Sequence, residues 1–97
     1  MGQSSSVEAS VALPGDEFVR KGLEDLQRGD ETVESLLVSI GAVRLVRLGF
    51  RVGHPIASPE HRLYALLAAD APDDAHARYN ALIRRLVSFE RAAECAT

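Results

Sequence analysis

Cysteine is scarce in this chain, tryptophan is absent, and no long uncharged stretch occurs. Cys95 is the single cysteine among 97 residues, so no disulfide forms within the chain and a reducing, cytoplasmic location is expected. The longest run without a charged residue covers nine positions, 35–43, whereas a helix that crosses a bilayer needs about 20 apolar residues. Two tyrosines and three phenylalanines are too few to mark an obvious binding hot spot.

The composition is that of one small globular domain. Hydrophobic residues make up 46% of the chain and charged residues 26%, and the length leaves room for a single core. We predict a flexible N-terminal tail at 1–13 and a single helical domain at 14–97. The opening "MGQSSS" fits a short myristoylation pattern on Gly2, but no basic cluster or nearby cysteine supplies a second membrane signal, so no membrane partner is expected.

Charge is distributed unevenly along the sequence. Residues 1–34 have a net charge of −5, residues 35–69 of +3 and residues 70–97 of −1. An acidic first third and a basic middle indicate internal pairing or separate partner surfaces. Ten arginines stand against one lysine, and together with the many alanines this indicates a GC-rich genome and a bacterial source.

Helix-breaking residues and the regular spacing of apolar residues predict an all-α fold, a compact bundle of four to five helices. Pro14-Gly15 and Gly29 bound the first helix, and Ser58 followed by Pro59 suits the start of the fourth. Apolar residues recur between these breaks at the spacing of one helix face. The expected helices cover approximately residues 16–28, 31–40, 42–48, 59–69 and 73–94.

Gly41 interrupts the helical phase. If the helix continued through it, Arg44 and Arg47 would project from the apolar face of the preceding residues. We therefore predict a change of direction and a short new helix. The alternative is an α+β fold with a strand at 46–52, where apolar residues alternate with arginines and glycines, paired with a strand at 7–13.

The last helix carries a wide apolar stripe with one carboxylate on it. The stripe follows spacings of four and three residues: Ala75, Tyr79, Leu82, Leu86, Phe89 and Ala93. Its width is typical of a helix that packs on its own core. Glu90 falls inside the stripe, so we expect a buried ion pair with Arg44 or Arg47, in which Glu90→Gln lowers stability at neutral pH. Alternatively, the last turns fray and Glu90 points to water.

No spacing in the sequence indicates catalysis or a bound metal. The candidate ligands do not form a close H-x₃-H or C-x₂-C pair; they are His54, His61, His76 and Cys95. The sequence also lacks the G-x-S-x-G motif, whose tight turn exposes a nucleophilic serine, and it lacks a glycine-rich phosphate-binding loop. We therefore expect a protein that is not an enzyme, with no cofactor.

These features favour a non-catalytic helical module for protein–protein interaction or regulation, whose partner is another protein or a second copy of the chain. The alternative is a nucleic-acid-binding regulator. In that case, the segment around Gly41 would resemble a helix-turn-helix, with Arg44, Arg47 and Arg51 as its cations. The overall net charge of −3 argues against it, because binding to phosphate favours a basic surface.

Overall fold

The computed structural model describes residues 13–96. This part of the chain forms five helices: α2 (Asp16–Arg28), α3 (Val33–Ile40), α4 (Ala42–Arg47), α5 (Pro59–Asp70) and α6 (Ala75–Ala96). The predicted all-α bundle is confirmed. Apart from Leu13, the predicted tail at 1–13 and the strand proposed at 7–13 lie outside the described residues, as does Gly2.

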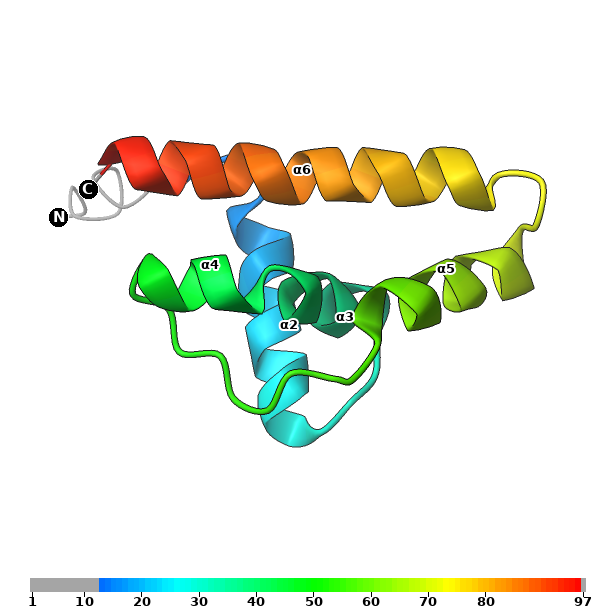
Figure 1. Cartoon of the computed structure of the whole chain (residues 1–97), viewed down its shortest axis with the longest axis horizontal. Coiled ribbons are helices and arrows are strands. Elements are labelled where there is room, and N and C mark those ends of the chain that lie inside the picture. Colours follow the sequence, from blue (N-terminus) through cyan, green and yellow to red (C-terminus); the bar gives the residue numbers. More distant parts are fainter. Residues whose placement is uncertain (1–12, 97) are drawn as a thin grey trace, which may run out of the picture.

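The longest helix, α6, lies along one side of the molecule, over the other helices (Figure 1). Beneath it, α3 packs against α2, α5 and α6 and is the central helix of the bundle. All five residues from Ser35 to Ser39 are buried. Residues 35–40 of the longest uncharged stretch of the sequence lie on this central helix.

Several helix ends follow the local sequence signals. The chain leaves α2 through Gly29, whose φ of 78° is in the left-handed region that glycine adopts readily. The start of α3 is fixed by Thr32 and Ser35, whose side chains each accept a hydrogen bond from the other's backbone N–H. We predicted that this helix starts at about residue 31. Because Thr32 is the N-cap, the first helical residue is Val33, two residues later. Pro59 opens α5 as expected, although Ser58 makes no side-chain cap.

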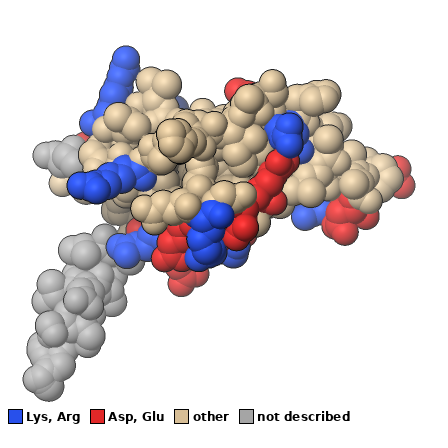
Figure 2. All heavy atoms as spheres, turned by 90° about the horizontal axis from the view of Figure 1, so that it is seen from below, with Lys and Arg blue, Asp and Glu red and all other residues tan. Residues whose placement is uncertain are grey.

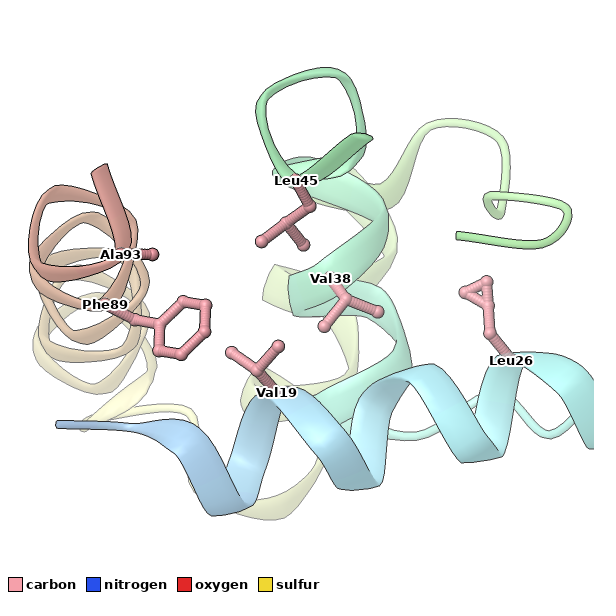
Figure 3. Close-up of a cluster of buried hydrophobic side chains, with 6 residues drawn as sticks. All are labelled: Val19, Leu26, Val38, Leu45, Phe89 and Ala93. Atoms are coloured by element: carbon pink, nitrogen blue, oxygen red, sulfur yellow. The ribbon is translucent and has the colours of Figure 1, made fainter. Parts of the chain in front are cut away.

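The core consists of two clusters of buried side chains that meet at α3 and α6. The first cluster contains Val19, Leu26, Val38, Leu45, Phe89 and Ala93 (Figure 3). The second contains Leu36, Leu37, Leu63, Leu67, Ala75 and Leu86. Since α6 supplies side chains to both, its wide apolar stripe packs on the protein's own core, as the sequence indicated.

The segment after Gly41 is helical and not extended. The short helix α4 runs in a different direction from α3 (Figures 1 and 3). The alternative strand at 46–52 does not form: residues 13–96 contain no strand. Backbone hydrogen bonds continue past α4, from the N–H of Phe50 to the carbonyl of Leu45, and Phe50 then packs on Phe89 with ring centroids 5.5 Å apart. Of the alternating apolar residues, Leu48, Phe50 and Val52 pack against the core, whereas Val46 lies on α4 and is exposed.

Asp25 joins the end of α2 to the start of α3. Its side chain is buried and accepts hydrogen bonds from Lys21 Nζ at 2.7 Å, Arg28 Nη2 at 2.6 Å and Thr32 Oγ1 at 2.7 Å. The first of these hydrogen bonds, followed by that from Thr32, lowers the pKa of Asp25 below its usual value. The same Thr32 caps α3, so one buried carboxylate fixes the turn between the two helices.

Candidate interaction surface

The outer side of α4 carries two exposed valines. Its inner side is held by Ala42 and Leu45, which are buried. Val43 and Val46 lie one turn apart and are 71% and 55% exposed, more than any other large hydrophobic side chain among residues 13–96. Together with Arg47 they form a surface that we call the α4 ridge. Clustered exposed apolar residues of this kind mark contact sites for other molecules.

Two hollows flank the α4 ridge. The larger, of about 590 Å³, lies between α4 and α6, and we call it the α4–α6 groove. It is lined by Val43, Arg44, Arg47 and Leu48 on one side, by Ile83, Leu86, Val87, Glu90 and Glu94 on the other, and by Ile40 and Gly41 where α3 meets α4. The smaller, of about 470 Å³, lies against the segment at 52–55. Val43 and Arg47 line both hollows, so the ridge stands between two recesses.

The three arginines singled out in the sequence lie in different surroundings. Arg44 is half-buried in the groove, where its Nη2 donates a hydrogen bond to Glu94 Oε1 at 2.8 Å and its Nη1 lies 3.6 Å from Glu90 Oε1. Arg47 is exposed on the ridge, and Arg51 is exposed in the segment after α4 and does not line the groove. The structure thus brings Arg44 and Arg47 to one groove and leaves Arg51 outside it.

Glu90 is a buried carboxylate in the wall of the groove. It is 4% exposed, and α6 continues to Ala96, so the last turns do not fray at this residue. Burial raises the pKa of Glu90, the nearby Arg44 lowers it, and the negative charge of Glu94 raises it again; the net direction is upward. Burial therefore outweighs the cation, and we now expect a stability effect of the opposite sign to the one that we expected from the sequence.

Gly41 allows α6 to approach the junction of α3 and α4. Its φ of −90° is available to any residue, so backbone freedom is not the reason for a glycine here. A Cβ atom at this position would lie 2.7 Å from Glu90 Oε2 and 3.2 Å from Leu86 Cδ2. The glycine that marks the change of direction is also the one that leaves room for the Glu90 carboxylate.

We expect Glu90→Gln to raise the free energy of unfolding at neutral pH. Because the folded-state pKa lies above the unfolded value, the charged carboxylate costs stability above the folded pKa. This cost decreases as the pH falls from the folded pKa and is gone below the unfolded pKa. The difference between the variant and the wild type should therefore shrink on acidification. Urea unfolding at several pH values measures it.

Glu94→Gln is the matched control for this substitution. Glu94 is 60% exposed and hydrogen-bonded to Arg44, so its replacement should lower stability by at most about 1 kcal/mol, as for other surface ion pairs. A Glu90→Gln protein that is less stable than the wild type at neutral pH would show that the ion pair with Arg44 prevails over burial.

The remaining residues that could carry chemistry stand apart from one another. The side chains proposed as nominal ligands are all exposed: His54, His61, His76 and Cys95. Within residues 13–96, no three His, Cys, Asp or Glu side chains converge as the ligands of a metal ion would. No helix in the same range has the length and hydrophobicity needed to cross a membrane.

Sequence reasoning did not identify Val43 and Val46 as site residues. The phase break at Gly41 was the available signal, because a helix that restarts there with Leu45 inward must turn the neighbouring valines outward. Whether other helices cover those valines depends on the tertiary packing.

We found no matching family model, no matching curated protein and no matching solved structure for this chain.

Proposed function

We propose that the protein is a non-catalytic module that binds another protein through the α4 ridge and the adjoining groove. The observation that carries the proposal is the exposure of Val43 and Val46 on the same side of a helix whose other side is anchored in the core. Burying a valine side chain fully contributes roughly 1.5–3 kcal/mol, so covering this pair would be a substantial part of a binding energy.

The charges around the ridge support a protein partner over a nucleic acid. Arg44, the less exposed of the two arginines in the groove, is engaged with two carboxylates of α6 and is not free to meet phosphates. The valines occupy the centre of the ridge, where a nucleic-acid-binding helix places polar side chains that read bases. Seen from below, basic and acidic side chains lie beside one another along one margin and uncharged residues cover most of the remaining surface (Figure 2).

The residues that line the α4–α6 groove suit the binding of a protein surface. Its polar side chains are two arginines and two glutamates, and its other lining residues are apolar or glycine. Such a set suits shape and charge complementarity with a partner surface.

We also propose a cytoplasmic location and a bacterial source. The single cysteine supports the location, and the excess of arginine over lysine supports the source.

Affinity capture from a lysate of the source organism tests this function. We expect the wild-type protein to retain a partner protein, and Val43→Ser/Val46→Ser to retain it at least about tenfold less well, because two valine contacts are lost. Leu66→Ser is the matched control: Leu66 is 40% exposed on α5, away from the ridge, and its replacement should leave retention unchanged.

Circular dichroism of each variant shows whether the fold is intact. Equal retention by the wild type and the double-serine variant would contradict the proposal. So would salt-sensitive retention of duplex DNA that is lost in Arg47→Ala/Arg51→Ala, which would support the nucleic-acid-binding alternative in its place.

A further inference from the structure

We propose that the occupant of the α4 ridge and the α4–α6 groove is a second copy of this chain, in a twofold-symmetric dimer. The inference rests on the proposed function and names its partner. In this dimer, the ridge of each copy lies against the groove of the other. Symmetric contacts of this type use the same surface on both copies, so that surface must fit itself in shape and in charge.

The shape of the surface meets the first requirement. The ridge protrudes through Val43 and Val46, and the groove of about 590 Å³ lies directly beside it. The far wall of the groove presents Ile83 and Val87, which are only partly buried within one copy. A protruding ridge and a recess that has apolar residues on its walls thus lie side by side, and a twofold axis between them places each ridge in the partner's recess.

The charges meet the second requirement. On the α4 wall of the groove Arg47 is exposed, and Arg44 is already paired with the α6 carboxylates of its own copy; on the α6 wall Glu94 is 60% exposed and Glu90 is buried. A twofold axis that runs along the groove brings the α4 wall of one copy over the α6 wall of the other. Arg47 is the cation that each copy presents to Glu94 of the other, and opposite charges that face each other across an interface favour this pairing.

The same arrangement disfavours a partner of one charge sign. A strongly acidic peptide would meet Glu94, and a strongly basic one would meet Arg47. In either case one wall of the groove is repulsive, and like charges brought together at an interface weaken binding. A copy of the chain carries both signs at the required places, because it carries the same two walls.

Sedimentation of the purified full-length chain over a range of concentrations tests the dimer. We expect a reversible monomer–dimer equilibrium with a Kd in the micromolar range, as suits a small interface. Val46→Asp should weaken the dimer at least about tenfold, because it places a charge among the buried valines. Leu66→Asp, on the exposed side of α5, should leave the Kd unchanged.

Charge reversal gives a sharper test of the geometry. In Arg47→Glu alone, each α6 wall faces a glutamate, and in Glu94→Arg alone, each Arg47 faces an arginine, so both variants should dimerise at least about tenfold more weakly than the wild type. When the two variants are mixed, every contact between position 47 of one copy and position 94 of the other again joins opposite charges. The mixture should therefore form a heterodimer.

A wild-type chain that stays monomeric at high micromolar concentration would overturn the dimer, as would charge-reversed variants that fail to associate on mixing while each remains folded. In that event, capture of a different protein that still depends on Val43 and Val46 would leave the proposed function standing. If the double-serine substitution changes neither capture nor sedimentation, both proposals fail.

Discussion

Replacing Asp25 with alanine should lower the free energy of unfolding by about 3 kcal/mol. The buried carboxylate accepts three hydrogen bonds, two of them from cations, and bonds to charged groups contribute roughly 1.5–3 kcal/mol each. The estimate is below the sum because Lys21 and Arg28 are more than half exposed and water can solvate them after the change. Urea unfolding followed by circular dichroism measures the loss.

The loss should depend on pH in a definite direction. The folded-state pKa of Asp25 is depressed, so its contribution is complete above the unfolded pKa of about 3.9 and disappears as the pH falls through the folded value. The matched control is Glu24→Ala, which removes an exposed acid from the same helix and should change stability by less than about 0.5 kcal/mol. Similar losses in the two variants would contradict the assigned role of Asp25.

Gly22→Ala should destabilise the protein by about 2 kcal/mol, although alanine is the better helix former by about 1 kcal/mol. Gly22 lies where α2 contacts α3, and a Cβ atom there would come within 2.4 Å of the backbone carbonyl oxygen of Glu34 and 2.8 Å of Val38 Cγ1. A backbone atom cannot rotate aside, so the two helices must move apart. The midpoint of thermal unfolding should fall accordingly.

Gly53→Ala separates this effect from a general response to added methyl groups. Nothing lies within 4 Å of a Cβ atom at position 53, so the variant should match the wild type in stability. If Gly22→Ala were as stable as Gly53→Ala, the close approach of α2 and α3 would not be a determinant of the fold.

The sequence predicted the helices well because their signals are local. Gly29, Pro59 and the phase break at Gly41 act within a few residues of their own positions, and the observed helices end close to the predicted bounds. The less accurate bounds have local causes too: Thr32 and Ser35 form the cap of α3, a pairing that we did not anticipate.

Contacts between distant segments were harder to predict. Lys21 and Arg28 lie four and three residues from Asp25, a spacing visible in the sequence, but the burial of that carboxylate depends on how α2 packs on α3. In the candidate site, we expected an arginine partner for Glu90. Whether burial or the attraction to that arginine dominates the pKa of Glu90 could be judged only from the structure. The groove beside Val43 exists only because α4 and α6 come together.

Site-specific photo-crosslinking in cells of the source organism shows whether the α4 ridge contacts protein. A photoactivatable amino acid is placed at position 46, and at position 66 as the control, both of which are exposed. We predict covalent adducts with protein from position 46, including adducts with a second copy of the chain, and far fewer from position 66. Equal yields from the two positions, or adducts with nucleic acid alone, would contradict the claim.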